Sequence, residues 1–512
     1  MSTPKKSVGD PHIRYRSLND LWGRNRAIIR GQRFAKAYDT FIDTINFKNL
    51  LLPFSPTMTQ KQYDFFKSEA ELPGICSQYV SVIVGGLLRK GITLDLPDSV
   101  PEEAKNWILN DISIDGKSLV SFLDSSLNEE FQTGRTFVQI DLPVVPNFDD
   151  LTPEERKQIA PFLQYINAES VINWRSGVDR FGKQALVLLV IRTYEENLQE
   201  NEFHPTYMDT VYVHDLDTTG YYRIRKYQKA VDSSPTNVVG DVIQNYNTVG
   251  EDFSLIYTNT NFLVNGERID YIPIFPLNGE IEPIEPLFTA LVDREVALYN
   301  KVSRRNHLLL GAATYTPVIM SDMSDDEFGK VVQAGLGSWL HLSKDDKIDT
   351  LKTPTDALNN MEESIKTTLD ELAKLGIRML SPESAESGVA LEIRNAAQTA
   401  RLGSLNTKIS QTMRDVITIM LNWRYNLDLK IEDISFTLSN DFNPVPIGEE
   451  FMRIIGEWYS QGLIDRPTFI GVLKANDIVG ADYDDDEAQK AITTDPLIKE
   501  PVDTESTTMV KK

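Results

Sequence analysis

The amino-acid sequence predicts an α+β fold, and three observations lead to that prediction. Residues 161–276 contain short alternating apolar runs separated by turn residues, a pattern typical of antiparallel strands. The chain on both sides of this block carries apolar residues at helical spacing. The longest helical stretch, residues 389–423, would form a helix of about 50 Å, which needs neighbours along most of its length.

The part before the strand block is predicted to be mainly helical. Residues 1–12 are polar and expected to be disordered, and residues 13–38 have the pattern of a basic amphipathic helix. The basic face of that helix is either solvated or docked on an acidic neighbour or nucleic acid. Residues 63–88 are helical on both sides of a break at Pro73 and Gly74. The elements expected next are a strand at 91–97, helices at 99–109 and 119–131, and a strand at 134–143.

Within the strand block, turn residues separate the individual strands. The expected strands are at 162–167, 185–193, 210–214, 221–227 and 262–271. Turn signals lie at 215–220 and at Asn265-Gly266. Closely spaced prolines from Pro273 to Pro286 then end the sheet and hold the chain extended, because residues before proline avoid the helical region.

Two helices with a small insertion between them follow the strand block. The helices are expected at 287–310 and 355–376, where apolar residues recur every three or four positions. The insertion is expected to contain a strand at 314–320, a helix at 325–333 and a strand at 338–342. A polar loop at 381–388 has no large apolar side chain and leads into the long helix.

The C-terminal part is predicted to be a compact helical segment. Helices are expected at 448–459 and 465–473, with Asp465 as the N-cap of the second and Pro467 in its first turn. The acidic tail at 491–512 shows no periodicity and is expected to be disordered.

Composition limits the class of protein. The 512 residues are 41% hydrophobic and 25% charged, and no apolar run approaches the roughly 20 residues of a membrane span. The start of the chain lacks the apolar segment of a secretory signal. The single cysteine, Cys76, excludes an intrachain disulfide and is expected to be a buried small residue rather than a nucleophile. The net charge of −23 argues against tight duplex binding but allows a surface along which DNA slides.

The sequence lacks the motifs of common enzymes and cofactor sites. Gly335-Leu-Gly is not followed by the third glycine of a dinucleotide-binding loop. The acidic run at 482–487 resembles a calcium loop, but Glu487 replaces the turn glycine and Thr493 replaces the last ligand. We therefore expect no catalytic residue, no cofactor and no metal, which favours a structural or mechanical role.

Several stretches resemble segments of tailed-bacteriophage portal proteins, the rings through which DNA enters and leaves a capsid. Ile274-Phe-Pro-Leu-Asn-Gly-Glu, followed by Ile284-Glu-Pro-Leu-Phe-Thr-Ala-Leu-Val-Asp, resembles the approach to the family's first stem helix. Ser387-Gly-Val-Ala-Leu-Glu-Ile resembles the segment that leaves the tunnel loop. Val171-Ile-Asn-Trp-Arg resembles a segment of one divergent group, and Gly462-Leu-Ile-Asp-Arg-Pro-Thr resembles a turn near the family's C-terminus.

The resemblance extends over about residues 60–480 and implies a portal fold, a ring usually of twelve subunits around a central DNA channel. The implied parts are an N-terminal wing at 1–280, a first stem helix at 281–311, a clip at 312–354, a second stem helix at 355–378, a tunnel loop at 379–388, a long wing helix and its return at 389–444, and a helical crown at 445–490. The implied partners are double-stranded DNA, the terminase, the major capsid protein or scaffold, and tail adaptor proteins. The implied location is the portal vertex of a virion assembled in the host bacterial cytoplasm, without a membrane.

Two groups of residues are candidates for contacts in such a ring. The tunnel-loop candidates are Ser381, Glu383, Ser384, Glu386 and Ser387. An acidic bore gains nothing from counterion release, so the duplex could move past it; an ordinary solvent loop is the alternative. The candidates where the stem meets the clip are Lys301, Arg304, Arg305, His307, Asp322, Asp325, Asp326 and Glu327. The basic members would pair with the acidic members of a neighbouring copy or with DNA phosphates.

Two other functions stay open on the sequence alone. The first is a different phage head or adaptor protein. The second is a cytosolic hydrolase with an unrecognised site, which would need clustered carboxylates with strongly shifted pKa values in a cleft. Paired stem helices would leave apolar stripes exposed unless copies of the chain pack around an axis, which a hollow ring in images would reveal.

Overall fold

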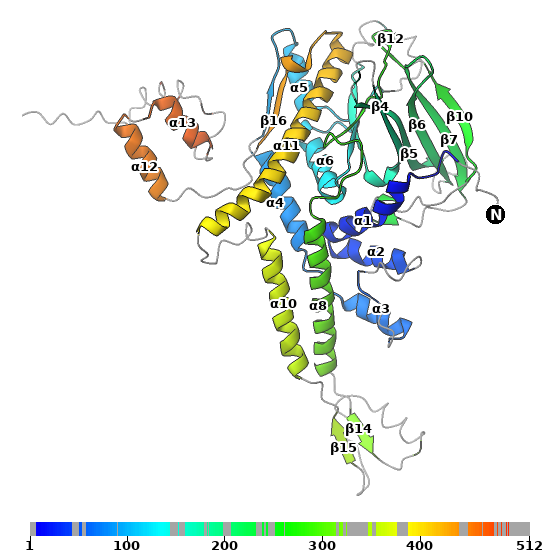
Figure 1. The fold of residues 1–512 in the computed structure, drawn as a ribbon, viewed down its shortest axis with the longest axis vertical. Coiled ribbons are helices and arrows are strands. Elements are labelled where there is room, and N and C mark those ends of the chain that lie inside the picture. Colours follow the sequence, from blue (N-terminus) through cyan, green and yellow to red (C-terminus); the bar gives the residue numbers. More distant parts are fainter. Residues whose placement is uncertain are drawn as a thin grey trace, which may run out of the picture. The chain divides into compact units, whose positions relative to one another are not determined.

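The computed structural model combines helices and sheets, as the α+β prediction requires, in two compact units, Met1–Asn440 and Asp441–Lys512 (Figure 1). The residues that the structure describes are 7–43, 51–53, 58–89, 91–143, 152, 159–178, 182, 184–197, 206–231, 238–239, 242–243, 251–260, 262–313, 317–320, 324, 347–350, 355–375, 388–439, 449–462, 464–475, 479, 483, 488 and 490. Among these residues, no helix is long and apolar enough to cross a membrane.

The largest sheet has five antiparallel strands in the order β10-β7-β6-β5-β4. Its strands are β4 (Val171–Val178), β5 (Gln184–Asn197), β6 (Thr206–Leu216), β7 (Tyr222–Val231) and β10 (Ser254–Asn259). The predictions for β5, β6 and β7 are confirmed, whereas the two edge strands β4 and β10 were not predicted as strands. A short pair, β8 (Val238–Val239) and β9 (Val242–Ile243), lies between β7 and β10 in the chain.

The predicted strand at 262–271 is wrong. The chain instead forms a tight hairpin of β11 (Leu263–Val264) and β12 (Glu267–Arg268). Asn265 and Gly266 join these strands with φ values of 52° and 85°. Positive φ at both central residues is the conformation that two-residue hairpin turns prefer, so the turn signal outweighs the apolar pattern around it.

Two smaller sheets complete the β structure of the first unit. β2 (Phe137–Asp141) lies between β3 (Phe162–Ile166) and β13 (Ile274–Pro276), which confirms the strands predicted at 134–143 and 162–167. β1 (Ile92–Asp95), also predicted, pairs with β16 (Ser435–Leu438) from the far end of the unit. A 3-10 turn, η5 (Ile431–Asp433), precedes β16.

The N-terminal basic segment forms two helices rather than the single helix predicted at 13–38. These are α1 (Ile13–Arg30) and α2 (Gln32–Asp43), and Gly31 between them has a φ of 96° that ends α1. The next helices are α3 (Gln60–Glu69), α4 (Ile75–Arg89), α5 (Glu102–Asn110) and α6 (Leu119–Thr133). The break predicted at Pro73 and Gly74 lies between α3 and α4 and is confirmed.

Three arginines of the basic helix α1 are committed to partners inside the chain. Arg14 pairs with Glu282 at 2.9 Å, and Arg24 pairs with Asp293 at 2.7 Å. Arg26 is fully buried, and its guanidinium binds the carboxylates of Glu129 and Glu169. Helices α1, α4 and α6 contact one another in the body. The docking alternative for the basic face therefore does not apply to these three side chains.

The remainder of the first unit has the predicted order of elements. It comprises α8 (Thr289–Ala313), β14 (Pro317–Met320), β15 (Lys347–Thr350), α10 (Thr355–Lys374) and α11 (Gly388–Tyr425). β14 pairs antiparallel with β15, a strand that the sequence pattern did not predict. The strand and helix predicted at 338–342 and 325–333 lie outside the described residues.

The second unit contains α12 (Glu449–Ser460) and α13 (Arg466–Ala475). The predicted N-cap is confirmed, because the Asp465 carboxylate accepts the Thr468 backbone N–H at 3.1 Å. The rings of Tyr459 and Phe469 stack at 4.5 Å and connect the two helices. The tail at 491–512 lies outside the described residues.

Candidate functional site: the helical hairpin

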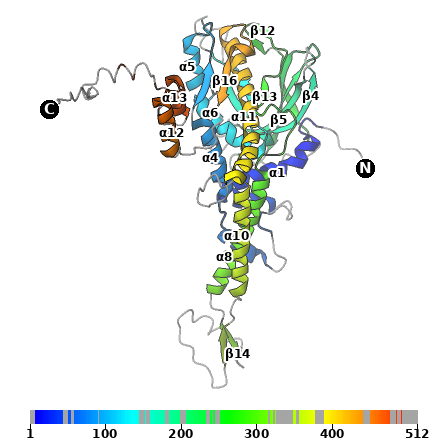
Figure 2. The same cartoon turned by 60° about the vertical axis from the view of Figure 1, so that its left-hand side comes forward.

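Helices α8 and α10 form an antiparallel pair, which we call the hairpin (Figures 1 and 2). α8 has 25 residues and α10 has 20. Leu298 and Ser303 of α8 and Thr368 and Leu372 of α10 are buried. We call the elements α1–α6, β1–β13, β16 and α11 the body of the first unit.

Polar contacts also link the two helices of the hairpin. The Lys301 ammonium donates to the Thr368 hydroxyl at 2.7 Å and to the Ser364 carbonyl at 3.3 Å. Arg305 pairs with Glu362 and Arg294 pairs with Glu371, each at 3.2 Å. All of these basic groups lie on α8 and all of their partners lie on α10. The two helices therefore attract each other along their length, although each exposed pair contributes little.

The first half of α8 is anchored in the body by a buried carboxylate. Glu295 is fully buried and accepts the backbone N–H groups of Ile75 at 2.8 Å and Cys76 at 2.6 Å. These two donors belong to the first turn of α4, whose N-terminal dipole favours a negative charge. Cys76 is itself buried, as predicted, and burial together with Glu295 raises the pKa of its thiol. The thiol is therefore not an active nucleophile.

The starting point of α8 is fixed by a close approach to the end of α6. Gly134 follows α6 in the left-handed conformation, with φ 65°. A Cβ atom at this position would lie 3.0 Å from the Cα of Pro286, three residues before α8. The Asn278 amide donates to the Gly134 carbonyl at 2.9 Å and fixes the same junction. Only glycine satisfies both the backbone conformation and the short distance.

Partly exposed leucines lie at both ends of the hairpin, Leu309 and Leu310 near its far tip and Leu369 and Leu375 near the body. Leu309, Leu310, Leu369 and Leu375 have between 37% and 42% of their surface exposed. Leu372, by contrast, lies between Leu369 and Leu375 in the sequence and is buried. The pair of helices therefore covers one apolar stripe and leaves others uncovered, which is the pattern of a surface that binds a further apolar element.

The structure places the basic candidates of the stem as follows. Lys301 and Arg305 face α10 in the same chain, and the ring of His307 lies against Phe66, with its Nδ1 4.0 Å from a Glu69 oxygen. Arg304 is exposed. Sequence reasoning missed the α10 partners Glu362 and Thr368, although α10 is visibly acidic in the sequence and follows α8 after only a short insertion.

The remaining candidates cannot be placed. Asp322, Asp325, Asp326 and Glu327 lie outside the described residues, as do the tunnel-loop residues Ser381, Glu383, Ser384, Glu386 and Ser387. Their contacts with a neighbouring copy or with DNA stay predictions.

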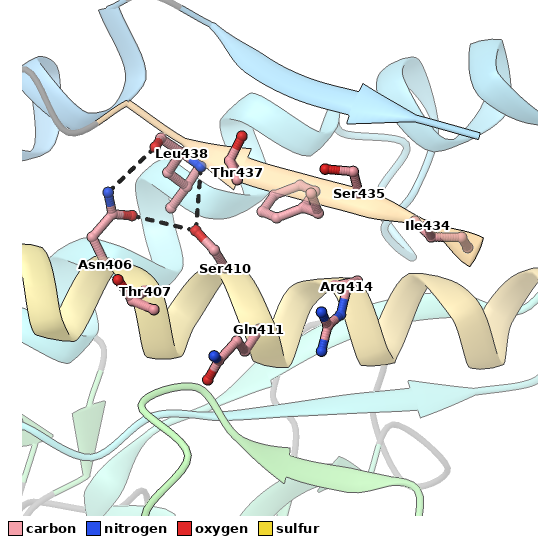
Figure 3. A pocket seen from close by; sticks show the side chains of 10 residues that line it. Asn406, Thr407, Ser410, Gln411, Arg414, Ile434, Ser435, Thr437 and Leu438 are labelled. Atoms are coloured by element: carbon pink, nitrogen blue, oxygen red, sulfur yellow. Dashed lines mark hydrogen bonds between the residues drawn. The ribbon is translucent and has the colours of Figure 1, made fainter. Parts of the chain in front are cut away.

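A hollow of about 230 Å³ lies between α11 and the outer edge of β16 (Figure 3). Asn406 donates its amide to the Leu438 carbonyl at 3.3 Å, and the Ser410 hydroxyl accepts the Leu438 N–H at 3.2 Å. These two side chains take the place of a further strand at this edge. The groups shown in Figure 3 thus hold β16 on α11, and we assign the hollow a structural role.

Carboxyl groups with raised pKa values do not form a pair. Burial raises the pKa of Asp20, Glu130, Asp141 and Asp415, in the case of Glu130 to about 7. They lie on α1, α6, β2 and α11, and none of the four acts on the pKa of another. In the part of the chain that the structure describes, no group of His, Cys, Asp and Glu side chains could hold a metal. The clustered carboxylates that a hydrolase would need are not found among these groups.

Comparison with known proteins gives one family match in sequence. Residues 286–424 match a family described as a domain of unknown function (DUF4055), a range that runs from the start of the hairpin almost to the end of α11. No curated protein matches the chain.

Solved structures with a similar arrangement come from gene transfer agent (GTA) particles. A chain in the virion of the native particle is 8% identical, with a TM-score of 0.36 over 80% of this chain and 91% of that chain. A chain in the neck of the native particle, computed with C12 symmetry, is 8% identical, with a TM-score of 0.34 over 82% and 95%. A chain in the neck of the empty particle, computed with C6 symmetry, is 8% identical, with a TM-score of 0.36 over 79% and 89%.

Proposed function

We propose that this protein is a portal subunit that forms a ring at one capsid vertex, through which DNA is packaged, retained and ejected. The observation that carries the proposal is the hairpin, on which Leu309 of α8 and Leu369 of α10 are 39% and 42% exposed. Side-by-side hairpins around an axis would bury these leucines in a heterologous interface that closes into a ring. The sequence segments that resemble portal proteins flank this hairpin on both sides.

The charge of α10 supports a DNA channel. Its sequence holds five acidic and two basic residues, and Glu362, Glu363 and Asp370 are exposed. A wall of such helices would repel phosphates and release no counterions, so that a duplex could move along it without being held. The tunnel-loop residues would continue this acidic surface, and the terminase, the capsid protein or scaffold and the tail adaptors would dock outside it.

The first test is the mass and shape of the purified protein. Twelve copies of the 58.0 kDa chain would give a particle of about 700 kDa with a central hole in electron micrographs. The double variant Leu309→Glu/Leu369→Glu changes only exposed positions and should release folded single subunits. The matched control is Ile114→Glu, which also places a carboxylate at an exposed apolar residue, but in the body. Ile114 is 66% exposed, and this change should leave the ring intact. A wild-type protein that remains a monomer would disprove the ring.

A second measurement separates a portal from another ring-forming head or adaptor protein. Procapsids assembled with this ring should take up DNA when a terminase and ATP are added, and procapsids with the double variant should not. A ring that forms but supports no DNA uptake would point to an adaptor instead.

A further inference from the structure

A larger cavity, of about 660 Å³, is lined by both main sheets of the body. Gln139 and Gln164 come from the three-stranded sheet, and Ile191, Tyr212 and His214 come from the five-stranded sheet. Its volume lies within the range of about 300–1,000 Å³ that is usual for small-molecule sites. It is separate from the hairpin, so the proposed ring function does not account for it.

The described wall of this cavity carries negative charge and no positive charge. Of the described residues that line it, Asp141 alone carries a formal charge at neutral pH. The Asp141 carboxylate accepts the Gln139 amide at 3.1 Å and the Leu142 backbone N–H at 2.8 Å. Burial raises the pKa of Asp141, which reflects a negative charge without a cation beside it. A carboxylate has room for further donors after these two bonds.

The neighbouring basic groups do not neutralise this charge. Lys226, beside the cavity wall, binds Glu195 at 2.7 Å, and the Tyr212 hydroxyl binds the same carboxylate. His214 is buried, and desolvation lowers its pKa to about 4, so its ring is neutral at pH 7. Its Nδ1 lies 2.7 Å from the Tyr222 hydroxyl, which fixes the ring. Phosphates and carboxylates would therefore meet a negative charge and no positive one.

Aromatic side chains form much of the remaining wall. They are Tyr165, Tyr212, Tyr257 and Phe262. The faces of such rings attract organic cations and cover their carbon chains. The amide oxygens of Gln164, Asn167 and Asn259 are further hydrogen-bond acceptors in the wall.

We propose that this cavity binds an aliphatic amine or guanidinium, whose charge is neutralised by Asp141 and whose carbon chain lies against the tyrosines. Two sources carry this chemistry. One is a free small organic cation, and the other is a lysine or arginine side chain of a second copy of the protein.

The test uses three five-carbon probes that differ only in charge. These are 1,5-diaminopentane, 1,5-pentanediol and glutarate, titrated by calorimetry into the full-length protein at pH 7.5. The diamine should bind, the diol should bind at least about tenfold more weakly because it carries no positive charge, and glutarate should not bind because its carboxylates repel Asp141. Equal affinity for all three, or no binding of the diamine to any form of the protein, would overturn the proposal.

Variants locate the binding in the cavity. Asp141→Asn keeps the shape of the side chain and should weaken diamine binding at least about tenfold. The control Asp124→Asn removes an exposed carboxylate from α6 and should leave binding unchanged. Tyr257→Leu changes a residue on the sheet edge that is nearly half exposed, so the fold should survive, and binding should weaken about threefold. Unchanged binding in both Asp141→Asn and Tyr257→Leu would exclude this cavity.

The assembly state distinguishes the two sources. Diamine binding to both the assembled protein and the Leu309→Glu/Leu369→Glu protein would identify a site for a free cation. Binding only to the double variant would show that a side chain of the next copy fills the cavity in the assembled form, and Asp141→Asn should then also weaken the assembly. This comparison does not depend on DNA, so the cavity can be tested even if the ring is not a portal.

Discussion

Two basic residues that bridge helices, Arg26 in the body and Lys301 in the hairpin, do so in different surroundings. Arg26 is fully buried, and its guanidinium binds Glu129 at 2.5 Å and Glu169 at 2.6 Å, both of them buried. Lys301 is half-buried and binds a hydroxyl and a carbonyl of α10. The bridging charge is therefore fully buried and paired with carboxylates in the body, and partly exposed and bonded to neutral groups in the hairpin.

Both regions expose apolar residues. The body buries Trp22 and Phe131 almost completely but leaves Ile114 and Val178 66% and 70% exposed, and the hairpin leaves four leucines 37–42% exposed. The exposed part of each leucine adds to stability only when something covers it. In the proposed ring, neighbouring copies would supply that cover. The following predictions test the contrast between the body and the hairpin in order of decreasing effect.

The largest expected effect is in the body. Arg26→Met would leave Glu129 and Glu169 buried without a cation and should lower the free energy of unfolding by about 3–5 kcal/mol. Chemical denaturation measures the loss. Arg16→Met, an exposed position on the same helix, is the control and should change it by less than about 0.5 kcal/mol. Equal losses of stability in the two variants would show that the ion pairs of Arg26 do not stabilise the body.

A pair of leucines in α10 tests the two sides of the hairpin. Leu372→Ala should cost about 2–5 kcal/mol, because it removes a buried side chain. Leu369→Ala, three residues earlier and 42% exposed, should cost less than about 1 kcal/mol in the isolated subunit. Both are measured in dilute solution, where the subunits are separate. The effect on ring assembly should be in the opposite order. Leu369→Ala should weaken assembly more than its small effect on subunit stability would suggest.

The pH dependence of stability tests the buried carboxyl of the body. Burial raises the pKa of Glu130 to about 7 from its ordinary value of 4.5, and the Asn278 amide, which donates to it at 2.8 Å, opposes the shift. The folded state therefore holds this proton more tightly than the unfolded state, and stability falls as the pH rises from about 4.5 through 7. Glu130→Gln should remove up to about 3 kcal/mol of this fall. Unfolding curves at pH 5 and pH 8 for the two proteins measure it. If the free energy of unfolding changed equally between these pH values in both proteins, the raised pKa of Glu130 would be contradicted.

The smallest expected effect is the loss of an exposed ion pair in the hairpin. Arg305→Gln breaks the 3.2 Å contact with Glu362, and both side chains are more than one-third exposed. The cost to subunit stability should lie between about 0 and 1 kcal/mol and should vanish in high salt. A cost as large as that of Arg26→Met would mean that the hairpin, like the body, is held by buried charge.

Local patterns in the sequence predicted the elements that depend on local chemistry. The helices α8, α10 and α11 follow from apolar spacing, and the break before α4 follows from Pro73 and Gly74. The N-cap Asp465 was predicted because Pro467 marks the first turn of the helix two residues later, and Asp465 accepts the backbone N–H of Thr468. In each case the decisive residues are within one or two turns of each other.

The features that could not be predicted depend on residues far apart in the chain. Arg26 meets Glu129 and Glu169 across 103 and 143 positions, so its charge read as a solvated or docking surface. β1 and β16 pair across most of the first unit. The cavity at Asp141 is assembled from separate strands of two sheets and leaves no signal in any one of them. The split between α1 and α2 was within reach, because Gly31 occupies a helix-ending position.

The contact between Gly134 and Pro286 has a mechanical consequence. α8 starts just after this contact and, at about 1.5 Å per residue, extends for about 37 Å. Its direction is fixed at two points, the Gly134–Pro286 contact and the Glu295 anchor in its first half. A tilt of about 10° at its base would move the far tip by about 6 Å. The position of the distant tip therefore depends on Gly134, about 37 Å away along the helix.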